Sequence, residues 1–247
     1  MVVITEQEIR ANGPGRIFVV CWRQWRTERA LARRGVRFRA TALKQVLAAY
    51  AAMSQAEFDA INGPQDWANW RTIPRALSRH VPDRPLRVLD LGCGTGGSTR
   101  VLAFYCPSGS RITGYEIAEP MLAFARCRDI RQRDGSMANV NFVCRGMTEV
   151  FPEPDTSVDL VNASGVVGHH LKPETIQPLI AQMQRVLAPE GVALLDVGPT
   201  MPARDLRRIM AEANFAYLGH YRSWFGDRTG AMVFRSSFST RAAPCKH

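Results

Sequence analysis

The sequence predicts an α/β fold: a doubly wound, mostly parallel seven-stranded sheet with an antiparallel terminal hairpin, preceded by a helical lid. Three observations lead to this prediction. After Pro85, short apolar segments alternate with amphipathic helical segments. The apolar segments are typical of strands that are buried on both faces of a sheet by helices, as in a parallel sheet. Only eight residues, SWFGDRTG, join the last two strands, too few for a helical crossover, so these strands must pair antiparallel.

Residues 1–40 form a basic N-terminal arm whose apolar periodicity is weak, and we expect part of it to be disordered. The stretch 16–39 holds eight arginines and one acidic residue, in a chain of formal net charge +10. Five arginines recur at roughly helical spacing beside two tryptophans: Arg23, Arg26, Arg29, Arg33, Arg37, Trp22 and Trp25. Such a face could meet RNA phosphates or anionic lipid, or it could be a solvated helix of an arginine-rich protein.

Residues 41–84 predict three helical segments, which we call the lid. Apolar residues recur at helical spacing over 41–50. The sequence SQAE is a capping box with Ser54 as N-cap and Glu57 at the third helical position. The helix that it opens ends at NGP, where Gly63 suits a left-handed cap. A third helical stretch follows and stops at VPDRP.

Residues 85–247 contain the sheet and its crossover helices. Proline opens one of the helices at its first position, Pro120, and lies near the start of another, Pro178. We expect strands at 86–91, 110–117, 139–145, 157–163, 191–198, 215–222 and 231–238. We expect helices at 97–105, 120–133, 173–187 and 202–213.

The stretch VLDLGCGTGG, residues 88–97, connects the first of these strands to the first helix. It fits G-x-G-x-x-G, the dinucleotide fingerprint, and equally G-x-G-x-G preceded by an acid. A helix N-terminus favours a pyrophosphate, but the carboxylate of Asp90 at the mouth of the loop would repel one. That carboxylate suits a ligand with an ammonium and a sulfonium, such as S-adenosylmethionine. Glu116, which ends the second strand, would accept ribose hydroxyl protons from either cofactor.

Several further stretches, in the same order as in a known family, extend this interpretation. RGMTEVFPEPDTSVDLVNASGVVGHHL (145–171) and VLAPEGVALLDVG (186–198) follow the glycine loop and Glu116. Together they resemble the motifs of class I S-adenosylmethionine-dependent methyltransferases of the small-molecule type. The resemblance begins at residue 86 and continues through the final hairpin, about two-thirds of the chain.

The resemblance implies a cofactor site for S-adenosyl-L-methionine. Relatives often carry an acid that accepts the adenine amino group at the position of Met147. We therefore expect adenine to pack against Met147 and Ile117, with polar contacts from backbone groups or Thr148. The expected cofactor-binding residues are Asp90, Gly92, Cys93, Gly94, Thr95, Gly96, Glu116, Ile117, Met121, Gly146, Met147, Thr148, Asn162, Ala163 and Ser164.

The acceptor is expected over the carboxyl ends of the strands, where such sheets bind ligands. Candidate walls of its pocket are Trp67, Trp70, Arg71 and Trp224, although the two lid tryptophans could instead pack the lid on the body. His169 and His170 are candidate general bases, with His169 preferred, because a neutral imidazole can take a proton at neutral pH. Both could instead only order the loop, and adjacent residues cannot both point inward.

We expect a methyltransferase that acts on a small-molecule acceptor by in-line transfer, which gains most from alignment and exclusion of water. An RNA or protein methyltransferase recruited by the basic arm is one alternative, and a non-catalytic cofactor-binding subunit is another. NASG (162–165) replaces the NPPY-type tetrad, which argues against methylation of nucleobase amino groups.

Other classes of protein are disfavoured by composition. The six cysteines show no C-x-x-C pair, so we expect neither a zinc site nor a disulfide framework, and no metal-ligand spacing occurs elsewhere. No run of about eighteen apolar residues predicts a membrane span. The first twenty residues lack the basic-then-apolar order of a secretory signal, so we expect a cytoplasmic protein. The sequence indicates no oligomeric state.

Overall fold

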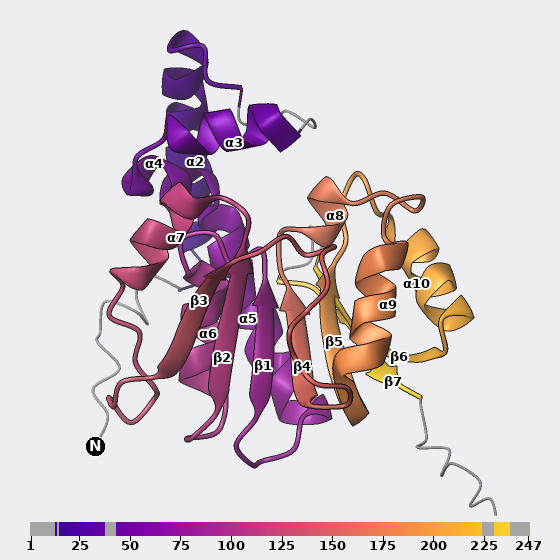
Figure 1. Cartoon of the computed structure of the whole chain (residues 1–247). Helices are drawn as coiled ribbons and strands as arrows, with labels where there is room; N and C mark the ends of the chain where they lie inside the picture. Colours follow the sequence, from indigo (N-terminus) through magenta and orange to yellow (C-terminus); the bar gives the residue numbers. More distant parts are fainter. Residues whose placement is uncertain (1–12, 14, 38–42, 224–229, 238–247) are drawn as a thin grey trace, which may run out of the picture.

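The computed structural model of the chain describes residues 13, 15–37, 43–223 and 230–237 (Figure 1). Within them, a seven-stranded sheet has the order β3-β2-β1-β4-β5-β7-β6. Its strands are β1 (Arg87–Leu91), β2 (Arg111–Glu116), β3 (Asn139–Cys144), β4 (Val158–Ala163), β5 (Leu187–Asp196), β6 (Phe215–Tyr221) and β7 (Ala231–Ser236). Strands β1 to β5 run parallel, and β7 pairs antiparallel with both β5 and β6. The predicted fold class is confirmed.

The central strands are apolar because both faces of the sheet are buried. Val88 pairs in register with Leu160, and Leu160 with Val192, and all three belong to one buried cluster. Their immediate neighbours Leu89 and Val161 point to the opposite face and belong to a second cluster. This alternation is the period-two pattern of a strand, with an apolar residue at each step.

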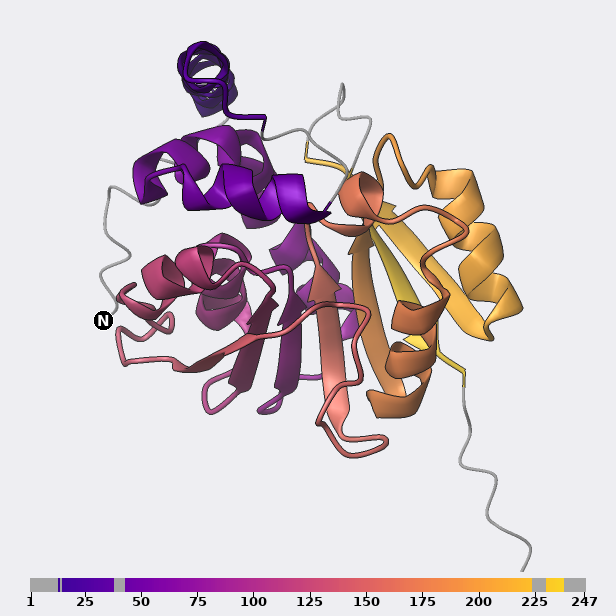
Figure 2. The ribbon, with the colours of Figure 1, turned by 45° about the horizontal axis from the view of Figure 1, so that its top comes forward.

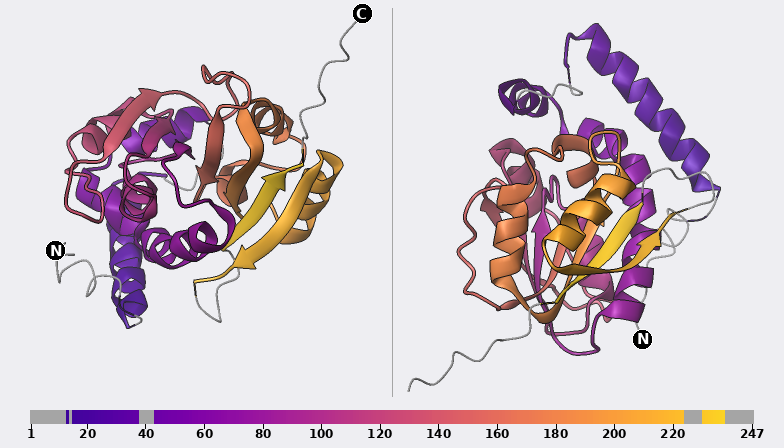
Figure 3. Two further views of the ribbon diagram at one scale, coloured as in Figure 1. Left: turned by 90° about the horizontal axis from the view of Figure 1, so that it is seen from below. Right: turned by 90° about the vertical axis from the view of Figure 1, so that its right-hand side faces the viewer.

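Helices cover both faces of this sheet (Figure 3). The clusters place α5 and α6 on one face, and α9 and α10 on the other. The helices after β1 are α6 (Gly97–Tyr105), α7 (Glu119–Arg126), α8 (Val167–His170), α9 (Gln177–Val186) and α10 (Ala203–Glu212). The expected helix over 120–133 is wrong beyond Arg126, because the chain turns back there and Arg131 bridges to Met137.

Within the described residues, four helices precede the sheet: α2 (Arg16–Arg33), α3 (Leu43–Ala51), α4 (Gln55–Ile61) and α5 (Gly63–His80). The capping box at the start of α4 is present, since Ser54 accepts from the Glu57 N–H at 3.3 Å and Glu57 accepts from the Ser54 N–H at 2.9 Å. The partial disorder expected of the basic arm does not extend to α2, which is helical throughout. Residues 1–12 and 38–40 of that arm lie outside the described residues.

The lid helices α3 and α4 lie across the carboxyl ends of the strands, on the same side as the short helix α8 (Figure 2). The reversal of strand order between β1 and β4 is also at this edge, and such a switch point opens a crevice for ligands. None of the helices in the described ranges is long and apolar enough to cross a membrane.

Candidate cofactor and substrate cavity

A cavity of about 500 Å³ lies between the lid and the carboxyl edge of the sheet. Its walls come from the turn after β1, the end of β2, the loops after β3 and β4, and the helices α3 to α5. This volume falls within the range of small-molecule and cofactor sites.

The turn after β1 needs its glycines for two separate reasons. Gly92, Gly94 and Gly96 have φ values of +66°, +54° and +85°, where a side chain would be strained. Space is also lacking, because a Cβ on Gly92 would lie 2.3 Å from Val166 and one on Gly94 would lie 2.9 Å from the Phe58 ring. The loop is therefore packed directly against both the loop after β4 and the lid.

Glu116 is buried at the end of β2 and faces this turn. Its two carboxylate oxygens accept hydrogen bonds from the backbone N–H of Gly94 at 3.1 Å and of Ala118 at 2.9 Å. Burial raises the pKa of this carboxyl, while the two backbone hydrogen bonds act in the opposite direction. A carboxylate oxygen has two lone pairs, so the fixed carboxylate keeps capacity for a pair of hydroxyl donors. The Gly94 N–H, in contrast, already donates its hydrogen bond to Glu116 and is not available to a phosphate.

Asp90 is placed differently from our expectation. It is fully buried and does not line the cavity. Its carboxylate accepts from the hydroxyls of Ser98 and Thr99 at 2.8 and 2.6 Å, and from the Asn162 side-chain amide at 2.7 Å. The first turn of α6 and the paired strand β4 thus supply its donors. Asp90 holds the base of the glycine turn rather than facing a ligand.

The other expected cofactor residues divide into two groups. Those that line the cavity are Gly92, Cys93, Gly94, Thr95, Glu116, Ile117, Gly146, Met147, Thr148 and Ser164. Those that do not are Gly96, Met121, Asn162 and Ala163. Met121 packs instead in a buried cluster with Phe58 and Met53 of the lid.

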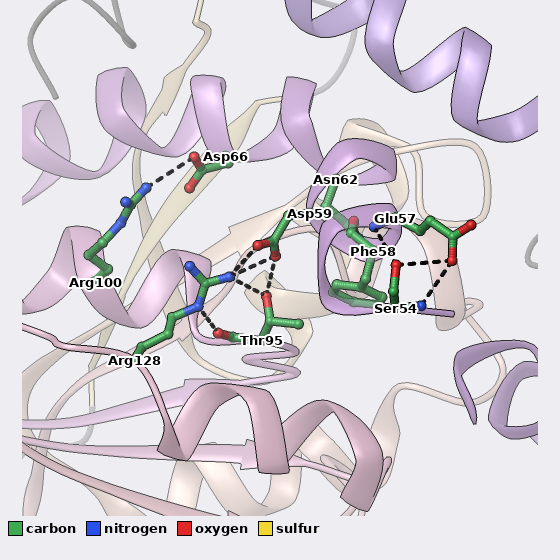
Figure 4. Close-up of polar contacts among 9 residues, drawn as sticks. All are labelled: Ser54, Glu57, Phe58, Asp59, Asn62, Asp66, Thr95, Arg100 and Arg128. Atoms are coloured by element: carbon green, nitrogen blue, oxygen red, sulfur yellow. Dashed lines mark hydrogen bonds and ion pairs between the residues drawn. The ribbon is translucent and has the colours of Figure 1, made fainter. Parts of the chain in front are cut away.

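The lid is tied to the glycine turn by a group of charged and polar side chains (Figure 4). Asp59 on α4 accepts from the Thr95 hydroxyl at 2.6 Å. Arg128, just after α7, donates to both Asp59 oxygens at 2.7 and 2.6 Å and also to the Thr95 hydroxyl and carbonyl oxygens. A second ion pair joins Arg100 on α6 to Asp66 on α5 at 3.3 Å. These contacts hold the lid over the turn.

Apolar and aromatic side chains form part of the cavity wall. Ile117, Met147 and the lid residues Tyr50 and Phe58 are among them, with the Tyr50 and Phe58 rings edge to face at 5.2 Å. Burial, and secondarily the charge of Glu116, raises the pKa of Tyr50 to about 12. The Tyr50 hydroxyl is therefore protonated at neutral pH and can donate a hydrogen bond.

The two adjacent histidines point to different places. His170 lines the cavity, whereas His169 does not. The Nε2 of His169 lies 4.0 Å from a carboxylate oxygen of buried Asp196. That carboxylate also accepts from the backbone N–H groups at the start of α8, including Val166 at 3.0 Å. Burial, and next the charge of His169, lowers the pKa of His170, so its imidazole is neutral at neutral pH. The structure thus brings His170, and not His169, to the cavity wall.

The lid tryptophans pack and do not line the cavity. Trp67 carries the Arg71 guanidinium 3.7 Å above its ring, and its Nε1 donates to the Gly13 carbonyl at 3.2 Å. Trp70 packs edge to face against Phe104 at 5.5 Å. Neither tryptophan nor Arg71 is part of the cavity wall, contrary to our expectation. The fourth candidate, Trp224, lies outside the described residues.

Sequence reasoning did not find the lid residues that face the cavity. Polar and charged members of this wall are Asp59, Asn62, Gln65, Asp66 and Asn69. Arg100, Arg128 and Arg145, which lie outside the lid, also line the cavity and were also missed. The SQAE capping box fixes where α4 begins, and this start determines which α4 residues turn toward the glycine loop.

Known proteins resemble this chain in both sequence and fold. Residues 88–191 match the family described as "Methyltransferase domain". The chain is 34% identical to a trans-aconitate 2-methyltransferase of Delftia acidovorans, over 72% of this chain and 63% of that protein. It is 33% identical to the uncharacterized protein syc1184_c of Synechococcus sp., over 72% of this chain and 42% of that protein. The chain thus spans less than two-thirds of the length of either relative.

The fold matches solved structures as well. A magnesium protoporphyrin IX methyltransferase from Synechocystis, solved with bound S-adenosylmethionine, superposes with a TM-score of 0.56 at 17% identity. The match covers 80% of this chain and 93% of that one. At this identity the similarity shows the fold, and the family follows from the matched domain and the sequence relative. The chain carries a class I S-adenosylmethionine-dependent methyltransferase domain.

Proposed function

We propose that this chain is an enzyme that transfers a methyl group from S-adenosylmethionine to a small-molecule acceptor held beneath the lid. Its domains are then the basic arm at 1–40, the lid at 41–84 and the methyltransferase domain at 85–247. The observation that carries the proposal is the cavity itself. About 500 Å³ is enclosed by a lid that Asp59 and Asp66 tie to the opposite wall, which leaves room for a cofactor and a small acceptor.

The residues that face the cavity support this cofactor. The carboxylate of Glu116 would accept two ribose hydroxyls while its backbone hydrogen bonds keep it in place. Ile117 and Met147 of the cavity wall would hold adenine by packing, and Tyr50 would cover it from the lid. When bound, the cofactor supplies a methyl group that its sulfonium has already activated. The work left for the protein is to align the acceptor and exclude water.

The hydrogen bond of Glu116 beside the glycine turn favours this cofactor over one with a pyrophosphate. Glu116 takes the Gly94 N–H, so this donor is not available to a phosphate. The Glu116 carboxylate would repel a doubly anionic group and attract a ligand with a positive sulfonium and an ammonium. Asp59 adds little to this effect, because Arg128 balances its charge.

The charges of the cavity wall favour a neutral or weakly charged acceptor. Arg128 and Arg100 are each paired with a carboxylate of the lid, so their positive charge is largely balanced locally. The Delftia relative is named for trans-aconitate, a tricarboxylate. An acceptor with three negative charges would need a surplus of positive charge that this wall does not offer. His170 would take the proton of a hydroxyl or ammonium acceptor.

Turnover of an acceptor panel tests the proposal. Purified chain is incubated with S-adenosylmethionine and, separately, with hydroxylated aromatics, amines, monocarboxylates, trans-aconitate, a mixed RNA and a protein extract. Formation of S-adenosylhomocysteine is followed by mass spectrometry. We expect turnover with at least one small acceptor, above the rate with trans-aconitate. Methylation of only RNA or only protein would contradict the proposal, and so would tight cofactor binding without turnover of any acceptor.

A further inference from the structure

Helix α2 presents an apolar, aromatic face to solvent. Phe18 is 79% exposed, Trp22 54% and Trp25 49%. They occupy positions i, i+4 and i+7, so they lie along one side of the helix. Large apolar side chains exposed as a contiguous group are uncommon on a soluble surface and mark an interaction site.

The opposite side of α2 packs against the rest of the protein, so the helix is held with its aromatic side chains facing solvent. Leu31 is fully buried in a cluster with Phe58 of the lid. Val20 lies close to Gly63 at the start of α5: a Cβ added to Gly63 would be 3.4 Å from the Val20 Cβ. Figure 3 shows α2 at the periphery of the molecule, with its outer side uncovered by the other described elements.

Arginines flank the aromatic side chains. The Arg26 guanidinium lies 4.7 Å from the Trp22 ring centroid, and that of Arg29 lies 4.4 Å from the Trp25 centroid. Arg23 is exposed as well, and α2 contains a single acidic residue. The outer face thus carries three large aromatic side chains with exposed arginines beside them, which complements a surface that is negative outside and apolar beneath.

We infer that α2 is a membrane-surface helix that binds the headgroup region of bilayers containing anionic lipid. Phenylalanine and tryptophan partition into the boundary between headgroups and acyl chains, and arginines attract the lipid phosphates. Because α2 contacts α4 and α5, this binding would bring the lid side of the molecule next to the bilayer. The inference does not depend on which acceptor is methylated, or on whether one is.

Two other occupants fit these observations less well. RNA bases would have to stack on the indole faces, but a guanidinium already covers one face of each tryptophan. A second copy of the chain, paired through the same face, would bring the arginines of both helices together and repel. A lipid surface needs only the apolar area and the positive charge.

Co-sedimentation of the full chain with large vesicles tests the inference. One set contains phosphatidylcholine with 30 mol% phosphatidylglycerol, and the other contains phosphatidylcholine alone. We expect binding to the anionic set at least tenfold tighter, weaker in high salt, and accompanied by a blue shift of tryptophan emission. The combined substitution Phe18→Ser, Trp22→Ser and Trp25→Ser should lower the affinity at least tenfold.

Charge is tested separately on a matched pair of variants. Arg26→Gln with Arg29→Gln should lower binding at least fivefold. Arg207→Gln with Arg208→Gln removes two exposed charges from α10 and should leave binding within twofold of the parent. Circular dichroism confirms that each variant is folded. If the triple variant unfolds, the single substitution Trp22→Ser replaces it, with a loss of at least threefold expected.

Several results would overturn the inference. These are equal binding to both vesicle sets, no binding to either, or an equal loss of binding in the α10 control. Tighter binding of a 20-nucleotide RNA that is lost in the triple variant would assign the face to RNA. A dimer in light scattering that the triple variant dissociates would assign it to a second copy.

Discussion

Asp59 on the lid helix α4 accepts a 2.6 Å hydrogen bond from the hydroxyl of Thr95, a residue of the glycine turn 36 positions away in the chain. Arg128 binds both groups from a third segment. The lid and the turn that faces the cofactor cavity therefore share one set of hydrogen bonds. A change that loosens the lid here should also loosen the turn.

Asp59→Asn should weaken S-adenosylmethionine binding by about three- to tenfold. A loss of this size is what the free energy of a partly exposed ion pair and its hydrogen bonds would cause. The amide keeps the shape of the side chain but offers one acceptor oxygen in place of two. Calorimetry measures the change. Asp129→Asn is the matched control, since it removes an exposed carboxylate that pairs with Arg131 outside the cavity. Equal affinity in the two variants would contradict the link between lid and turn.

The part of the site that is local in sequence could be predicted. The glycine turn and Glu116 could be found because a strand, a turn and a helix N-terminus follow one another directly in the chain. Glu116 then needs only the neighbouring parallel strand to face the turn. Asp59 and Arg128 could not be found, because 69 residues separate them and only the packing of the lid brings them together.

Asp90 shows what a sequence motif leaves open. It occupies the expected position at the end of β1, but Asn162 of the paired strand, 72 residues later, supplies one of its donors. Ser98 and Thr99 supply the others. A sequence motif gives the place of a carboxylate and not which way it points. The burial of Leu31 in the helix Arg16–Arg33 could not be predicted for a related reason, since it comes from packing against the lid.

Glu116→Gln should raise the dissociation constant of S-adenosylmethionine by roughly 10- to 100-fold, or about 1–3 kcal/mol. The side-chain NH₂ would face the backbone N–H of either Gly94 or Ala118, so one donor would lose its acceptor. Glu119→Gln, an exposed carboxyl paired with Arg126, is the control. If both variants bind the cofactor like the parent, the ribose does not contact Glu116.

Gly94→Ala should impair cofactor binding at least tenfold, whereas Gly135→Ala should not. Both glycines have positive φ, +54° and +85°, so both variants carry backbone strain of about 1–2 kcal/mol. A Cβ at Gly94 would additionally lie 2.9 Å from Phe58, while none of the surrounding atoms lies within 4 Å at Gly135. Thermal denaturation and calorimetry separate the two effects. The same loss of affinity in both would mean that contact between lid and turn has no role.

His170→Ala should lower turnover by roughly 10²–10⁴-fold with an acceptor that must lose a proton, the usual contribution of a general base. His169→Ala, at the neighbouring position outside the cavity, should lower it less than tenfold. Cofactor affinity should be unchanged in both. Comparable losses of turnover in the two variants would mean that both histidines only order the loop and that neither is the general base.

The pH dependence of turnover gives a separate check on His170. Only the neutral imidazole accepts a proton, so the rate should rise with pH through the pKa of His170 and level off above it. Burial and the charge of His169 lower that pKa, so the ascending limb should fall below the ordinary histidine value of about 6.5. A limb at or above that value, or one that persists in His170→Ala, would contradict this assignment.

The central claim is that the cavity between the lid and the glycine turn holds S-adenosylmethionine. Titration calorimetry of the full chain with S-adenosylmethionine, and in parallel with NADH, tests it most directly. We predict one site with a dissociation constant in the micromolar range for S-adenosylmethionine, weakened in Glu116→Gln, and no measurable binding of NADH. Binding of NADH in preference to S-adenosylmethionine, or no heat with either, would contradict it.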